Sequence, residues 1–167
     1  MKQHIAFGLA LLFVIMMLSG CGQASQETAQ SILDQTGLNA DVAPAEAEDV
    51  SYALLELETD AQTLTVAEVS FTLDGIAYCY RTAATGVISD PIYDLTQHDL
   101  PDAVQASATL GWCVATLYYE DGGAGKIIWF DIVPGLLYSL EMETGASAEA
   151  LTTMAEYCYT PAQGEVG

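Results

Sequence analysis

Trp112-Cys-Val-Ala-Thr-Leu-Tyr-Tyr119, Glu120-Asp-Gly-Gly-Ala-Gly125 and Lys126-Ile-Ile-Trp-Phe-Asp-Ile-Val133 are three consecutive segments near the middle of the chain. The first and third are rich in aromatic and β-branched residues, as β-strands are. The glycine-rich segment between them has the composition of a hairpin loop. The strands are apolar along nearly their whole length, which indicates cover on both faces. We expect this hairpin to form the centre of a sheet.

The residues that follow predict one more strand and a helix. Pro134-Gly135 predicts a turn, and residues 136–142 predict the last strand. Ser147 is a good N-cap for a helix over 147–158, which Pro161 would end. Its apolar stripe, which should lie on the sheet, consists of Leu151, Met154, Ala155 and Cys158.

The residues before the central hairpin predict a second hairpin. Residues 66–73 alternate between apolar and polar, and Asp74-Gly75 is a tight-turn signal before a return strand over 76–82. Residues 52–58 predict a further strand, whereas 83–107 are irregular, with short strands expected around 92–95 and 103–106. The predicted fold is α+β: an antiparallel, curved sheet of about six to seven strands with a C-terminal helix packed on it and a short N-terminal helix.

The domain organisation follows from composition. Residues 1–20 form a predicted signal peptide, residues 21–47 an acidic tether, residues 48–163 a single domain and residues 164–167 a tail. The tether holds the short helix, from Thr28 to Thr36, which Gly37 ends. Ile32, Leu33 and Leu38 are the side chains expected to dock it on the domain.

The N-terminus has the three parts of a secretory signal. Lys2 precedes an apolar segment from Ile5 to Leu18, and the small residues Ser19 and Gly20 precede Cys21. The apolar segment is shorter than the roughly 20 residues that a membrane-spanning helix needs. We therefore predict a lipoprotein signal, cleaved between Gly20 and Cys21, with Cys21 carrying a diacylglyceryl group, whose two acyl chains suffice for stable anchoring. An ordinary secreted protein, with a chance cysteine at the cleavage point, is the alternative.

Charge excludes some partners. The chain has 23 acidic residues against three Lys and Arg, giving a formal net charge of −20 at pH 7. Nucleic acids are bound by rows of Lys and Arg, so we expect no nucleic-acid partner. Attachment to the extracytoplasmic face of the cell membrane is expected to occur through lipidated Cys21 alone. Self-repulsion favours a monomeric domain.

Metal binding and catalysis have little support in the sequence. No segment has the carboxylate spacing of a calcium loop, and Cys79, Cys113 and Cys158 form no C-x-x-C pair, so we expect no metal and no cofactor. We expect these cysteines to be buried thiols, with one disulfide as the alternative. Residues 120–127 lack the residues of a phosphate-binding loop, G-x-S-x-G is absent, and His98 is the one histidine beyond the signal. We therefore expect that the protein is not an enzyme. A carboxylate-dependent hydrolase is the alternative function.

A ligand groove is the sharper hypothesis about the domain. Aromatic faces beside one fixed charge suit a small acidic or sugar-like ligand. The residues that would form it are Tyr78, Tyr80, Arg81, Trp112 and Trp129. The alternative is that the aromatic residues fill the core and Arg81 pairs with a carboxylate of a neighbouring strand.

Two segments carry a resemblance to a known group: Glu68–Gly75 with Tyr80-Arg81, and Trp129–Leu140 with 149–157. Over roughly residues 37–163 the chain resembles an uncharacterised domain-of-unknown-function family of Gram-positive lipoproteins and sporulation-associated surface proteins, itself distantly like lipoprotein-sorting carriers and sensors. The resemblance implies an extracytoplasmic binding, sensing or structural module and brings no catalytic residues. The alternative within binding is a carrier of an acyl chain or peptide. It would need an apolar cavity beneath helix 147–158, lined by Phe71, Tyr78, Trp112 and Met154.

Overall fold

A computed structural model describes residues 27–59, 62–86, 94–96 and 98–161. Cys21, Gly20 and the rest of the predicted signal lie outside the described residues, as do 92–93 and 164–167. In chain order the elements are α2 (Ala29–Thr36), β1 (Glu48–Glu58), β2 (Thr63–Leu73), β3 (Ile76–Ala84), β4 (Val104–Leu110), β5 (Cys113–Tyr119), β6 (Gly125–Asp131), β7 (Leu136–Met142) and α3 (Ala148–Cys158).

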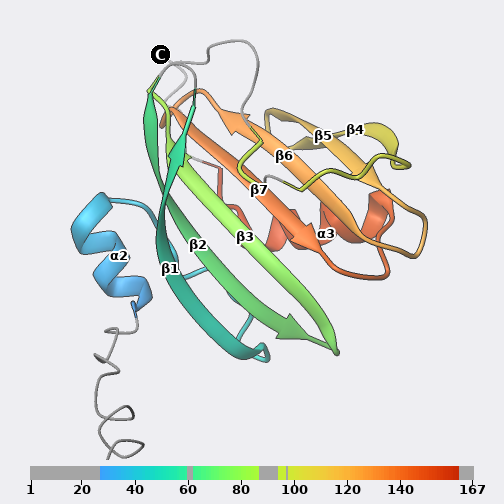
Figure 1. Cartoon of the computed structure of the whole chain (residues 1–167), viewed down its shortest axis with the longest axis horizontal. Helices are drawn as coiled ribbons and strands as arrows, with labels where there is room; N and C mark the ends of the chain where they lie inside the picture. The colour runs from blue at the N-terminus through green and yellow to red at the C-terminus, as the bar shows by residue number, and fades with distance from the viewer. Residues whose placement is uncertain (1–26, 60–61, 87–93, 97, 162–167) are drawn as a thin grey trace, which may run out of the picture.

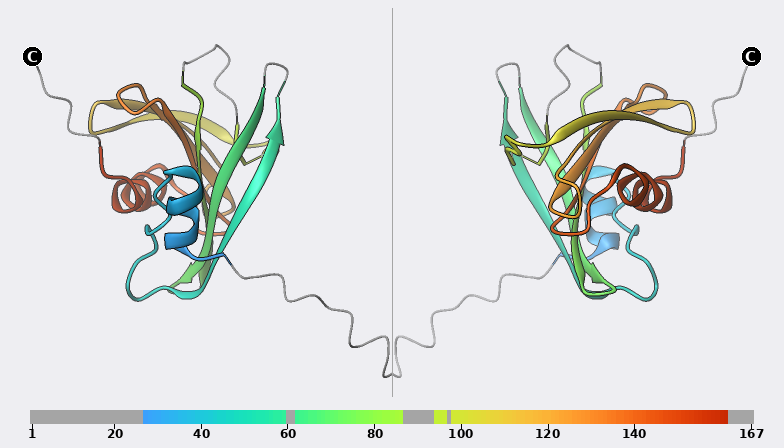
Figure 2. Two further views of the ribbon diagram at one scale, coloured as in Figure 1. Left: turned by 90° about the vertical axis from the view of Figure 1, so that its left-hand side faces the viewer. Right: turned by 90° about the vertical axis from the view of Figure 1, so that its right-hand side faces the viewer.

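The seven strands form one antiparallel sheet in the order β1-β2-β3-β7-β6-β5-β4 (Figure 1). The predicted α+β class is confirmed, with a C-terminal helix on the sheet and a short helix at the N-terminal side. Strand β7 lies between β3 and β6, so the last strand of the chain joins two meanders, β1–β3 and β4–β6. Figure 2 shows the sheet strongly bent, with α2 and α3 on one side of it.

Turn and cap residues set the element boundaries. Asp74 and Gly75 have φ angles of 51° and 76°, which close the β2–β3 hairpin, as the sequence predicts. Ser147 accepts the predicted N-cap hydrogen bond of α3, from the main-chain N–H of Ala150. Thr28, expected inside the short helix, is instead the N-cap of α2 and accepts from the main-chain N–H of Ser31. The strand expected over 103–106 is β4, which runs on to Leu110 and pairs with β5.

The sheet face that carries the helices, here the helix face, holds the main core. The apolar stripe of α3 is confirmed, with Leu151, Ala155 and Cys158 buried and Met154 packed against them. Ile32 and Leu38 are buried in the same core, together with Ala40 and Val42, while Leu33 is exposed. Residues 32–42, within the segment assigned to the tether, therefore supply core side chains.

The other side of the sheet, here the opposite face, carries a smaller apolar cluster. Its buried members are Leu64, Val66, Ala83, Leu95, Ile128 and Leu137. Residues 94–96 and 98–100 run across this face, in front of the strands in Figure 1. This segment, here the strap, separates the opposite face into a covered part and an open part, and the open part holds the candidate site.

Candidate functional site

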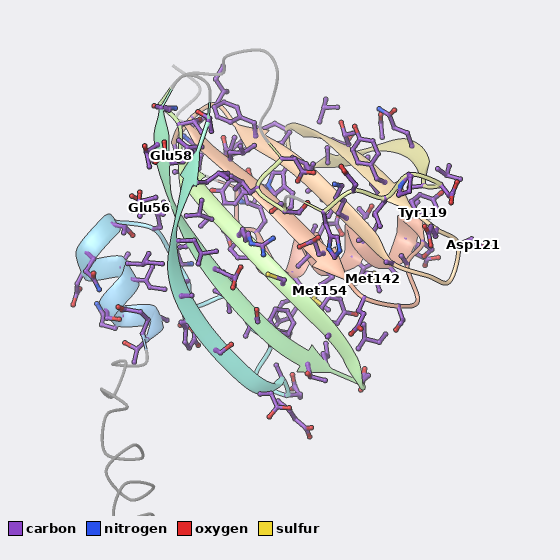
Figure 3. The ribbon with its side chains drawn as sticks, viewed as in Figure 1. Glu56, Glu58, Tyr119, Asp121, Met142 and Met154 are labelled. Atoms are coloured by element: carbon purple, nitrogen blue, oxygen red, sulfur yellow. The ribbon has the colours of Figure 1, made fainter. Side chains whose placement is uncertain are left out.

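A cavity of about 420 Å³ lies on the opposite face, at the end of the sheet where β2 runs into β3 and β7 ends. Strand alternation turns Ser70, Thr72, Ala77 and Cys79 toward it. These side chains are small, so the sheet surface is hollow here. His98 and Leu100 of the strap form a wall. Figure 3 marks Met142, at the end of β7, which also borders the cavity.

Arg81 is the centre of an ion-pair network next to the cavity. Its Nε donates to Glu68 Oε2 at 2.7 Å, and its Nη1 donates to Glu141 Oε2 at 2.9 Å. Nη1 also donates to the carbonyl oxygen of Thr96 in the strap, at 3.2 Å. Glu68 and Glu141 face Arg81 from the strands on either side of β3, because Glu68 is its cross-strand neighbour on β2 and Glu141 lies on β7. The Arg81 guanidinium thereby links the three strands β2, β3 and β7 to the strap.

Lys126 holds the strap from β6. Its side chain is only 7% exposed, and its ammonium pairs with the carboxylate of Asp94. It also donates to Thr96 Oγ1 at 3.3 Å and to the main-chain carbonyl of His98. Asp94 accepts the main-chain N–H and the hydroxyl of Thr96 at 2.9 and 2.6 Å. The strap is therefore fixed by hydrogen bonds to both cations of the described residues.

Glu141 and His98 connect this network to the cavity. His98 Nδ1 lies 3.2 Å from Glu141 Oε1, and both residues line the cavity wall. Arg81 and Thr96, on the other side of the network, line a second cavity of about 250 Å³. The network thus stands between two hollows of the opposite face.

Burial changes the acidity of two cavity residues. It raises the pKa of Glu141, while the charges of Arg81 and His98 act in the opposite direction. Burial also raises the pKa of the Cys79 thiol to about 11, with Arg81 opposing this shift. Cys79 is therefore a neutral thiol at pH 7. Glu141 has two partners, Arg81 and His98.

The structure does not gather the five residues of the predicted groove in one place. Tyr80 and Trp129 are buried in the core of the helix face. Tyr78 belongs to the same core, whereas Arg81, on the same strand, points to the opposite face. Trp112 lies in the β4–β5 turn, half exposed, where its Nε1 donates to Asp131 Oδ1 at 3.3 Å. Arg81 is paired with carboxylates of neighbouring strands, as the structural alternative expected.

The space beneath α3 is filled by aromatic rings. Trp129 stacks on Tyr138 at a centroid distance of 5.1 Å, and the ring of Tyr159 lies 5.1 Å from that of Tyr138. A cavity of only about 90 Å³ borders Tyr138 and Cys158 there. Of the four residues named for a carrier cavity, Phe71 and Tyr78 border the 420 Å³ cavity, which lies on the other side of the sheet from α3. Met154 packs against the core and Trp112 lies in its turn.

A buried carboxylate, Asp131, stands at the far end of β6. It is fully buried and accepts from the Tyr159 hydroxyl at 2.6 Å and from the main-chain N–H of Val133 at 3.1 Å. The Cys113 thiol lies 3.2 Å from the same hydroxyl. Burial and these hydrogen bonds raise the pKa of Tyr159. This polar chain fastens residue 159, just after α3, to the sheet.

The cavity, the strap and the ion-pair network are features that the sequence analysis missed. The signal for the network was present, because alternation along 76–82 already placed Arg81 and Cys79 on one face and the tyrosines on the other. Cys79, Cys113 and Cys158 are free thiols.

Within the described ranges, no group of three or more His, Cys, Asp or Glu side chains is arranged to hold a metal ion. The same ranges contain no helix that is both long and apolar enough to cross a membrane. Comparison with protein-family models, with curated proteins and with solved structures gives no match to this chain.

Proposed function

We propose that this protein is a lipid-anchored lipoprotein of the extracytoplasmic membrane face whose domain binds a small ligand without transforming it. The observation that carries the binding part is the cavity of about 420 Å³ on the opposite face. Its volume falls within the roughly 300–1,000 Å³ of small-molecule sites. The proposal includes membership of the lipoprotein family that the sequence resembles.

The lining supports binding of a compact, mainly apolar molecule. The apolar residues Phe71, Ala77, Leu100 and Met142 belong to the lining, while Ser70, Thr72 and Cys79 supply a few polar atoms. Binding sites commonly combine apolar walls with a few fixed polar groups.

The charged side chains next to the cavity are bound to one another, and this supports a non-catalytic role. Glu68 and Glu141 both bind Arg81, and Glu141 also binds His98. A carboxylate that acts as a base or nucleophile needs an oxygen facing the reacting atom. These partners hold the carboxylates in a structural network instead.

The sequence supports the anchor. Cys21 follows the apolar segment and the small residues of a lipoprotein signal, and residues 22–26 precede the described chain. Two acyl chains suffice for stable membrane attachment. The test is growth of an expressing Gram-positive host with radiolabelled palmitate. We expect label in the wild-type chain and none in Cys21→Ser, and equal labelling of both would refute the anchor.

Binding can be tested by protection of Cys79 from alkylation. The full-length lipidated chain, in nanodiscs of neutral phosphatidylcholine, is treated with N-ethylmaleimide, and modification of Cys79 is followed by mass spectrometry. The probe is 4-phenylbutanol, a neutral molecule small enough for the cavity. We expect it to slow alkylation of Cys79 several-fold in a saturable manner.

The matched variants are Thr72→Phe and Thr109→Phe. Thr72 lines the cavity, whereas Thr109 is an exposed residue of β4 on the same sheet face. Thr72→Phe should abolish the protection and Thr109→Phe should keep it. Absence of protection in the wild type, or protection that survives Thr72→Phe, would refute ligand binding in this cavity.

The apolar lining also favours the second candidate, a carrier of an acyl chain. The two functions differ in their dependence on chain length. A carrier should bind long neutral chains, such as hexadecanol, much more tightly than 4-phenylbutanol, whereas a site for a compact ligand should not.

A further inference from the structure

We propose that the ligand of this cavity carries a positively charged amine on its apolar body. This inference rests on the proposed binding function and adds the chemical class of the ligand. It follows from three observations: carboxylates line the cavity, Arg81 and Lys126 are already paired with other groups, and the chain has a strongly negative net charge.

Carboxylates dominate the ionisable groups of the lining. Asp49 of β1, Glu141 of β7 and Glu143 just beyond β7 border the cavity, and the one basic group there is the imidazole of His98. Asp49 and Glu143 are exposed, which places them at the rim, whereas Glu141 is half-buried next to the cavity wall. The apolar floor therefore opens between negative groups.

The cations of the described residues are already engaged. Arg81 binds Glu68, Glu141 and the Thr96 carbonyl. Lys126 binds Asp94, Thr96 and the His98 carbonyl, and its side chain is only 7% exposed. A carboxylate or phosphate entering the cavity would thus meet negative groups without a cation to receive it, and burying an unpaired charge is costly.

The electrostatic field of the whole chain also favours a cationic ligand. A formal net charge of −20 raises the local concentration of cations and lowers that of anions around the domain. An ammonium group at the rim, beside Asp49 and Glu143, would be attracted, while its apolar body would cover Ala77, Leu100 and the small side chains of the floor. A small amphipathic amine satisfies both parts of the site.

The test compares three probes of matched shape: 4-phenylbutylamine, 4-phenylbutanol and 4-phenylbutanoate. The full-length lipidated chain in neutral phosphatidylcholine nanodiscs is alkylated at pH 8, and protection of Cys79 is measured against probe concentration. We expect half-protection at about tenfold lower concentration for the amine than for the alcohol. The carboxylate should protect least. The preference for the amine should shrink as salt rises from about 0.01 M to 1 M, because salt screens exposed charges.

Variants of the rim distinguish the effect of the rim carboxylates from the effect of the net charge of the chain. Asp49→Asn combined with Glu143→Gln should reduce the preference for the amine over the alcohol, measured as the ratio of their half-protection concentrations. The matched control is Asp121→Asn combined with Glu58→Gln, which removes the same two charges at residues that do not line the cavity. Figure 3 marks Asp121 and Glu58 at opposite sides of the molecule. The control should keep the preference for the amine.

The outcomes are distinguishable from failure of the proposed function. Protection by the alcohol with no gain for the amine, or strongest protection by the carboxylate, would overturn the amine inference and leave ligand binding standing. Equal loss of preference in the rim variant and in the control would also overturn it, because the charge effect would not be local to the rim. Absence of protection by all three probes would overturn both proposals.

Discussion

Glu141 of β7 and Lys126 of β6 lie directly opposite one another in the sheet, but their charged groups reach to different partners. The Glu141 carboxylate binds Arg81 and His98, and the Lys126 ammonium binds Asp94 in the strap. The two residues thus belong to one continuous polar network across β2, β3, β7, β6 and the strap. Such networks are costly to interrupt, because each partner left behind is partly buried.

Replacing Arg81 by Met should lower the free energy of unfolding by about 2 kcal/mol at pH 7. Glu68 and Glu141, whose side chains are 20% and 16% exposed, would lose their shared cation. Urea unfolding measures the change. The loss should shrink at acidic pH, because burial raises the pKa of Glu141 and a protonated Glu141 needs no cation. Arg81→Lys, which keeps the positive charge, should lower the free energy of unfolding less than Arg81→Met does. Equal stability of Arg81→Met and wild type at pH 7 would contradict this role.

Replacing Lys126 by Met should release the strap. The methionine keeps an apolar stem in the place of the lysine stem, but it cannot donate to Asp94, Thr96 or the His98 carbonyl. Hydrogen exchange should accelerate at the main-chain N–H of Thr96, and unfolding should need about 1–3 kcal/mol less. The α3 amides serve as the internal control. Unchanged exchange at Thr96 would show that the strap does not depend on Lys126.

Stability should fall as pH rises from about 9 toward 12. Burial raises the pKa of Cys158, and mainly burial raises that of Tyr138, each to about 12. The unfolded chain releases these protons at lower pH than the folded chain, so higher pH favours unfolding throughout this window. Thermal unfolding at pH 7.5 and 10.5 measures the slope.

The variant for this prediction is Cys158→Ala, with Tyr157→Phe as the control. Cys158 is buried, whereas Tyr157 is 59% exposed on the same helix. Cys158→Ala should lose less stability than wild type between pH 7.5 and 10.5, although it starts from a lower value. A slope identical to that of wild type would contradict the buried-thiol explanation.

Gly125→Ala should destabilise the fold by about 1–3 kcal/mol, because a methyl group would overpack the contact between β6 and the start of α3. A Cβ at this position would lie 2.6 Å from the Cβ of Ala146 and 2.9 Å from that of Tyr119. Gly123→Ala is the control, since its nearest neighbour is the Glu120 side chain at 3.1 Å. Chemical denaturation should give a much lower free energy of unfolding for Gly125→Ala than for Gly123→Ala. The reverse order would refute this packing argument.

Local signals in the sequence predicted most of the fold. Alternation over 66–73, the Asp74-Gly75 turn and the Ser147 cap each act within a few residues, and each is confirmed. The strand expected around 103–106 was too short. Residues 104–110 do alternate between apolar and polar, but the alanines Ala106 and Ala108 are small and give only a weak apolar signal, and β4 is stabilised by its pairing with β5.

The site was harder to predict, because its interactions are non-local. Lys126 binds Asp94 and the His98 carbonyl, about thirty residues earlier, in a segment without periodicity. The cavity exists because small residues of β2 and β3 coincide on one face, and register is needed to see this. The aromatic residues chosen for a groove, Tyr80 and Trp129, are mostly core, as their abundance in a small sheet favours.

The position of β7 has a consequence for synthesis of the domain. Strands β3 and β6 acquire a partner on their second edge only when Leu136–Met142 is present. A nascent chain that ends before residue 136 therefore exposes two unpaired strand edges, which are prone to aggregation. The β3–β7 pairing also joins residues about sixty positions apart, and such closure is intrinsically slow. The domain accordingly completes its sheet only after β7 has followed the other six strands out of the ribosome.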